Sequence, residues 1–194
     1  MHALVRSFRV SSLNALVALL CTIAGIARAA GPYATTADGA DPRLMLKGYD
    51  PVTYLSAARP LIGAPSLKTD FDGVTYRFVT EENRFTFMKN PFKYVPLFGG
   101  MCAHSMTYAI PWPGDPEISK IVDGQVLLFG SDAARRHFVA DEAANLRLAQ
   151  RYWKEEVEGS IALVQRSRRL VMRVPHYKSD KDLEAEWRSR NARK

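Results

Sequence analysis

Two of the three Asp-Gly dipeptides in this 194-residue chain, Asp72–Gly73 and Asp123–Gly124, constrain it more than any other feature. Each stands between two short runs rich in β-branched and aromatic residues. A two-residue type I′ turn needs positive φ angles at both central positions, and Asp-Gly accepts them at low cost. The chain therefore has two predicted β-hairpins, which pair 67–71 with 74–79 and 118–122 with 125–129.

Helical signals follow each hairpin. Thr80 can cap a short helix with two glutamates in its first turn, and Asn90–Pro91 should end it because the residue before proline avoids helical geometry. Phe85 and Met88 share one face of that helix. After the second hairpin, Ser131 can cap a helix over 132–141.

A long helix is predicted from about Glu142 to Val174, where Pro175 should stop it. Apolar residues recur there at intervals of three and four, which is the pattern of one helical stripe. Gly159 is a candidate break. The stripe consists of Leu146, Ala149, Trp153, Val157, Ile161 and Val164.

The first 29 residues have the pattern of a secretory signal peptide. Arg6 and Arg9 form a positive n-region, 13–26 is apolar, and Ala27–Arg28–Ala29 matches an A-x-A cleavage site. The apolar run is shorter than the roughly 20 residues that a membrane helix needs. We therefore predict a cleaved signal peptide over 1–29 and a periplasmic or secreted mature protein without a stable membrane span.

Cleavage would leave Cys102 as the only cysteine, so no internal disulfide can form. If 101–108 is a strand, successive side chains alternate between its two faces, and Cys102, His104 and Met106 point the same way. Thiolate, imidazole and thioether form the ligand set that soft metals such as Cu(I) prefer. This pattern predicts a metal site, for copper or zinc, made by these three residues.

The metal interpretation needs a further ligand, because three residues on one strand cannot close a tetrahedral site. His137 and Met88 are the candidates to approach it through folding. The alternative is that Cys102 belongs to the core, since free cysteine and methionine are among the most frequently buried residues. The protein would then be a metal-free interaction or scaffold module.

Four motifs, in order, resemble the YHS-domain family in its exported branch. They are KGYDPVTY at 47–54, the run TYRFVTEENRFTFMKNPFKYVPLFGG at 75–100 with the MCA that follows, Asp115–Pro116, and the VDG turn at 122–124. The resemblance covers about 46–153. It implies a small α+β domain in which a short helix packs on an antiparallel sheet, and it implies a link to metals. Cys102 carries over from the family motif, whereas His104 and Met106 are features of this sequence.

The C-terminal part carries the basic charge of the chain. Residues 166–194 contain ten Lys and Arg against four Asp and Glu, a net charge of +6. A basic segment can meet acidic lipid, an acidic protein face or nucleic acid, or it can be a solvated helix end. An exported protein has little access to nucleic acid, so the partners left open are acidic lipid, a protein, or a second copy of the chain bound through 154–194.

Nothing in the sequence indicates catalysis. It contains no phosphate-binding loop, paired-acid signature or zinc-protease spacing. Cys102 and His104 could suggest a nucleophile and a base, but no acidic residue is evident to orient the histidine. We therefore predict a non-enzymatic α+β protein. Its expected parts are the signal peptide, an extended lead-in over 30–45 with little to bury, a YHS-like domain over 46–153 and a basic helical extension over 154–194.

Overall fold

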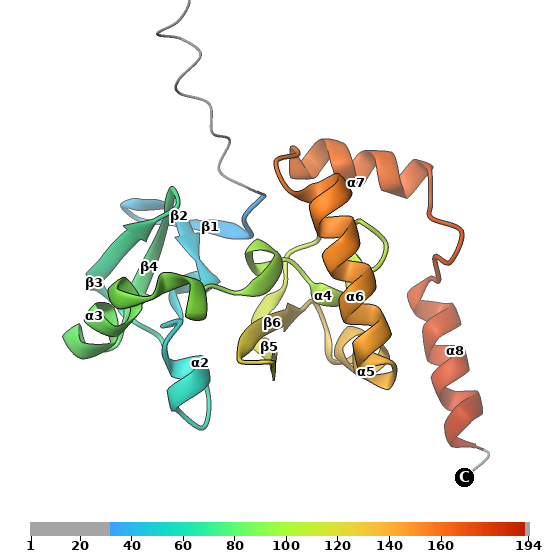
Figure 1. The fold of residues 1–194 in the computed structure, drawn as a ribbon, viewed down its shortest axis with the longest axis horizontal. Coiled ribbons are helices and arrows are strands. Elements are labelled where there is room, and N and C mark those ends of the chain that lie inside the picture. Colours follow the sequence, from blue (N-terminus) through green and yellow to red (C-terminus); the bar gives the residue numbers. More distant parts are fainter. Residues whose placement is uncertain (1–31, 193–194) are drawn as a thin grey trace, which may run out of the picture.

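A computed structural model describes residues 32–192, so the predicted signal peptide lies outside the described residues. The chain forms an α+β fold with two separate sheets (Figure 1). The first sheet has the strand order β1-β2-β4-β3, in which β2 and β4 run parallel, and the second is the hairpin β5-β6. The strands are β1 (Thr35–Asp38), β2 (Asp41–Met45), β3 (Ala64–Phe71), β4 (Val74–Phe78), β5 (Asp115–Val122) and β6 (Gln125–Phe129).

Both predicted hairpins are confirmed. Asp72 and Gly73 have φ angles of 51° and 73°, and Asp123 and Gly124 have 50° and 75°. The strand residues that flank each turn pair directly, Phe71 with Val74 and Val122 with Gln125. The register next to each turn is the one expected for a two-residue turn.

The expectation that 30–45 has little to bury is wrong. Strands β1 and β2 pair with each other, and β2 joins β4 from a distant part of the chain. Leu44 and Met45 are buried, and so is Asp41, which accepts hydrogen bonds from the Arg77 guanidinium on β4 at 2.6 and 2.9 Å. This short polar segment thus completes the sheet. The buried Asp41 carboxylate is paired with Arg77, which lies far away in the sequence, so the local sequence does not indicate the burial.

The short helix after β4 is confirmed as α3 (Glu81–Lys89), with the Thr80 hydroxyl accepting from the Asn83 amide. Phe85 and Met88 are half exposed, whereas Phe87 is buried. Phe87 lies among four aromatic rings of the first core, those of Phe71, Tyr76, Phe78 and Tyr94.

The predicted strand over 101–108 is wrong, because this segment forms the single-turn helix α4 (Ala103–Met106). Phe98, Gly99 and Gly100 all have positive φ angles and turn the chain sharply just before it. Cys102 then caps the turn with its backbone carbonyl, which accepts from the Met106 amide and the Ser105 hydroxyl. The short helical pieces elsewhere are η1 (Leu46–Gly48), α2 (Thr53–Ser56), η2 (Pro91–Lys93) and η3 (Leu97–Gly100).

The C-terminal part is helical, but the helix predicted over 142–174 is divided. Ser131 caps α5 (Asp132–Ala140) as expected, and α6 (Glu142–Tyr152) runs into a π-helical turn, η4 (Trp153–Val157). Gly159, with a φ of 75°, then redirects the chain into α7 (Ala162–Val171). A further helix, α8 (Asp180–Asn191), begins at the Ser179–Asp182 capping box and lies beside α5 (Figure 1).

Three buried clusters hold the described part of the chain together. The first lies between the four-stranded sheet and α3, and the second between the β5-β6 hairpin and helices α4, α5 and α6. A small third cluster joins Tyr108 and Ile110 to Val174. Among residues 32–192, no helix combines the length and the apolar character needed to cross a bilayer.

Candidate functional site

The three predicted metal ligands lie in different surroundings. Met106 is fully buried in the second core, and Cys102 is 4% exposed with its side chain packed near Gly130. Only His104 lines a cavity. The prediction that the three side chains point the same way assumed the alternation of side chains along a strand. A helical turn does not have this alternation. Met88, a candidate further ligand, is exposed on α3.

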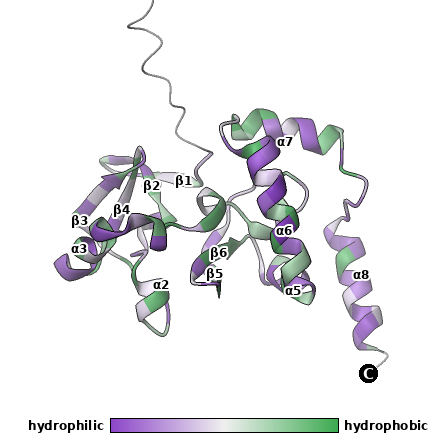
Figure 2. Cartoon of the chain, in the orientation of Figure 1, coloured by the Kyte–Doolittle hydropathy of each residue, from purple (hydrophilic) through white to green (hydrophobic). Residues whose placement is uncertain are grey.

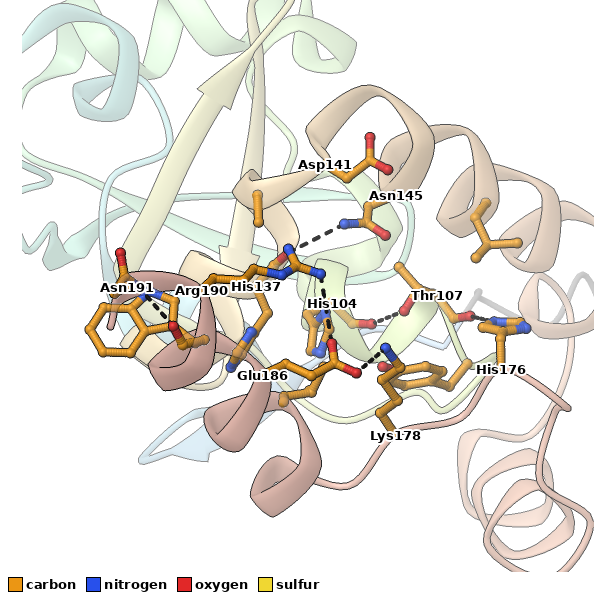
Figure 3. Close-up of a pocket in the computed structure, with 15 residues that line it drawn as sticks. His104, Thr107, His137, Asp141, Asn145, His176, Lys178, Glu186, Arg190 and Asn191 are labelled. Carbon is orange, nitrogen blue, oxygen red and sulfur yellow. Dashed lines mark hydrogen bonds and ion pairs between the residues drawn. The ribbon is translucent and has the colours of Figure 1, made fainter. Parts of the chain in front are cut away.

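The cavity that His104 lines has a volume of about 680 Å³ and lies between α4, α5, α6 and α8. Its titratable side chains come from segments far apart in the chain, which explains why no local motif marks it (Figure 3). They include His104, His137, His176, Lys178, Glu186 and Arg190.

His104 is the unusual member of this group. It is 8% exposed, and neither ring nitrogen has a hydrogen-bond partner in the structure. Burial, reinforced by the nearby His137, lowers the pKa of His104 to about 4, so the imidazole is neutral at pH 7. Buried polar atoms without a partner are rare in folded proteins, and each such group calls for an explanation.

His137, on α5, faces His104. The two ring centroids lie 6.1 Å apart, with the ring planes inclined by 33°. Partial burial lowers the pKa of His137 as well, while Glu184 opposes that shift. His137 was one of the two residues expected to approach His104 through folding, and the packing of α5 on α4 places it there.

His176 forms a fixed wall of the cavity. Its Nε2 lies 2.7 Å from the Thr107 carbonyl oxygen, which can only accept, so this nitrogen carries the proton. The ring stacks on Tyr152 at 5.9 Å and also contacts Tyr108. The sequence offered no signal for this role, because His176 follows the predicted helix stop and its partners lie on α4 and α6.

Helix α8 covers the cavity and contributes its charged side chains. Glu186 pairs with Lys178 and lies 3.7 Å from Arg190, and the Lys178 ammonium holds the pKa of Glu186 below its usual range (Figure 3). Apart from the buried Leu183, the contacts of α8 with α5 are polar or partly exposed, such as the Arg136 guanidinium over the Trp187 ring at 5.4 Å.

Because the pKa of His104 is lowered, we expect the free energy of unfolding of the metal-free protein to depend on pH. The unfolded chain takes up a proton on His104 near pH 6.5, whereas the folded protein does so only near pH 4. Between these values the unfolded state binds more protons, so the free energy of unfolding should fall by about 2–3 kcal/mol as the pH drops. Urea denaturation between pH 7 and pH 4.5 measures this loss.

His104→Leu is the matched variant for this prediction. It should remove most of the dependence in that window, leaving the smaller contribution of His137, whose pKa is shifted in the same direction. An equal slope in the variant and the wild-type protein would contradict the assignment to His104.

Within residues 32–192, no three His, Cys, Asp or Glu side chains are grouped so that they could hold a metal ion. His104 and His137 face each other as a pair only. No protein-family model, curated protein or solved structure matches the chain. The resemblance to YHS domains consequently remains a prediction from the motifs.

Proposed function

We propose that this chain is an exported, non-enzymatic binding protein and that its ligand is a transition-metal ion held by His104 and His137. The observation that carries the proposal is the buried imidazole of His104, whose two nitrogens have no partner. A neutral imidazole has a free lone pair, and it is the commonest protein ligand for transition metals. A bound ion would therefore satisfy a group whose burial otherwise costs free energy.

The residues present fit an ion that prefers imidazole. Zn²⁺ and Cu²⁺ suit nitrogen ligands, whereas Cu(I) selects thiolate and thioether. Cys102 and Met106 are buried and do not line the cavity, so the ligands that the cavity offers are imidazoles. Two histidines leave coordination positions free, and the cavity beside them has room for water or a small molecule to occupy those positions.

A binding role also agrees better with the site than a catalytic one. A cysteine nucleophile needs a base within hydrogen-bond reach. The ring nitrogens of His104 have no partner, so Cys102 makes no such bond with this histidine. The buried thiol is better explained as part of the core.

A second candidate function follows from the size of the cavity. A volume of about 680 Å³ lies within the range of small-molecule sites, which is roughly 300–1,000 Å³. The protein would then bind an organic ligand without a metal, with His104 offering one donor and one acceptor. In that case Cys102 is again core, which is the metal-free alternative that the sequence left open.

Metal retention under chelator competition tests the proposal. The purified protein is equilibrated with Cu²⁺ or Zn²⁺ and the metal content is measured for the wild type and four variants. We expect about one ion per chain in the wild type. His104→Leu and His137→Gln should lose the ion, whereas Cys102→Ala and Met106→Leu should keep it.

Two results would overturn the proposal. Loss of the ion in Cys102→Ala together with its retention in His104→Leu would restore the thiolate site. A wild-type protein that retains neither metal would exclude the metal and leave the organic-ligand candidate. Circular dichroism of each variant separates loss of the site from loss of the fold.

A further inference from the structure

Helix α7 is oriented with its polar side toward the protein. Gln165 is 4% exposed, and its side-chain amide donates to the Ala109 carbonyl at 3.2 Å and to Glu156 at 3.1 Å. Arg169 pairs with the same Glu156. Arg166 donates to the Pro111 carbonyl and lies over the Trp112 ring at 4.3 Å. These contacts fix the rotation of the helix, because a buried amide and an ion pair tolerate little displacement.

The opposite side of α7 is apolar and faces outward. Val171 is 84% exposed and Ile161 is 71% exposed, and within residues 32–192 nothing covers them. Figure 2 shows apolar residues along α7 at the periphery of the molecule. We call this surface the α7 apolar face; it consists of Ile161, Leu163, Val164, Leu170, Val171 and Met172.

The orientation of α7 is the reverse of that of most surface helices. A surface helix of a globular protein turns its apolar stripe to the core and its charged side chains to water. Contiguous apolar patches on a protein surface mark sites of interaction with another protein or a membrane. The α7 apolar face is therefore a candidate interaction site, and the charge beside it indicates which kind of partner fits.

The charged residues of α7 and of the loop that follows it are all basic. The sequence contains no Asp or Glu between Gly159 and Ser179, and in the same stretch it has four arginines and Lys178. Arg168 and Arg173 are exposed beside the apolar residues. Two copies of α7 packed face to face would place arginines against arginines with no acid from either helix, which is unfavourable.

We propose that the α7 apolar face binds the surface of an anionic lipid bilayer. Apolar residues flanked by basic ones are the composition of helices that lie in the interface of such a membrane. The apolar side chains would enter the boundary between headgroups and acyl chains, while the arginines extend toward the phosphates. This surface shares no residue with the histidine cavity, so the inference does not depend on the proposed metal.

Vesicle flotation tests the inference with defined lipids. The protein is mixed with vesicles of phosphatidylcholine alone or of phosphatidylcholine with phosphatidylglycerol, and the bound fraction is measured. We expect binding at least about tenfold stronger to the anionic vesicles and weakened by high salt. The double variant Val164→Ser, Val171→Ser should reduce the binding about tenfold or more.

Ile62→Ser is the matched control, because Ile62 is 63% exposed but lies far from α7 in the chain, between α2 and β3. It should bind like the wild type, and all three proteins should melt alike because the changed side chains are exposed. Equal binding of the double variant and the wild type, or no binding to anionic vesicles, would overturn the inference. A lipid-free dimer that the double variant dissociates, seen by sedimentation equilibrium, would assign the face to a second copy instead.

Discussion

Phe87→Ala is expected to lower the free energy of unfolding by about 3–5 kcal/mol. The Phe87 side chain is 1% exposed, and its ring centroid lies 4.9 Å from that of Tyr76 and 5.3 Å from that of Phe78. Truncation would leave a cavity between α3 and the four-stranded sheet that these rigid rings cannot close. Urea denaturation monitored by circular dichroism measures the change.

Phe85→Ala provides a control on the same helix. Phe85 is 54% exposed and contacts the Arg84 guanidinium rather than the core. We expect this variant to lose no more than about 0.5–1 kcal/mol. Equal losses in the two variants would mean that α3 presents a different face to the sheet.

Asp50→Ala should destabilise the protein by a similar amount, about 3–5 kcal/mol. The Asp50 carboxyl group is fully buried and accepts three hydrogen bonds. They come from the Val52 amide at 2.8 Å, the Val79 amide at 2.8 Å and the Asn83 side chain at 2.7 Å. These bonds join the turn before α2, the end of β4 and the start of α3, so alanine would leave three donors without a partner in three elements.

Two variants check the assignment to these hydrogen bonds. Asp50→Asn keeps one acceptor oxygen but places an amide group against a donor, so an intermediate loss is expected. Asp115 also precedes a proline and accepts from a backbone amide two residues on, at 3.0 Å, but its side chain is 38% exposed. Asp115→Ala should therefore cost only about 1 kcal/mol. A loss in Asp115→Ala as large as that in Asp50→Ala would show that burial is not the cause.

The candidate site was only partly predictable from the sequence. His104 was singled out because it stands two residues after Cys102, and its role in the cavity rests on a different geometry. His137 was named as a residue that folding could bring near, and α5 does bring it within 6.1 Å of His104. Glu186 and His176 carried no signal, because the helices that place them are joined by turns whose directions the sequence pattern does not give.

The elements that the sequence by itself determined are those governed by local chemistry. Asp-Gly at 72–73 and 123–124 allowed only a tight turn, and Thr80 and Ser131 each satisfy an amide at a helix start. The reason is that each of these interactions is complete within four or five residues.

Only the tertiary structure decided the rest. Segment 101–106 became a helical turn because the positive φ angles of 98–100 redirect it against β6 and α6. Phe87, rather than Phe85, became the core residue of α3 because rings from β3, β4 and the 91–96 segment meet there. Helix α7 turns its polar side inward because its side chains donate hydrogen bonds to Glu156 and to the Ala109 carbonyl. In each case the deciding partners lie in other elements of the fold, and the free energy of burial and pairing outweighs the weak local preference.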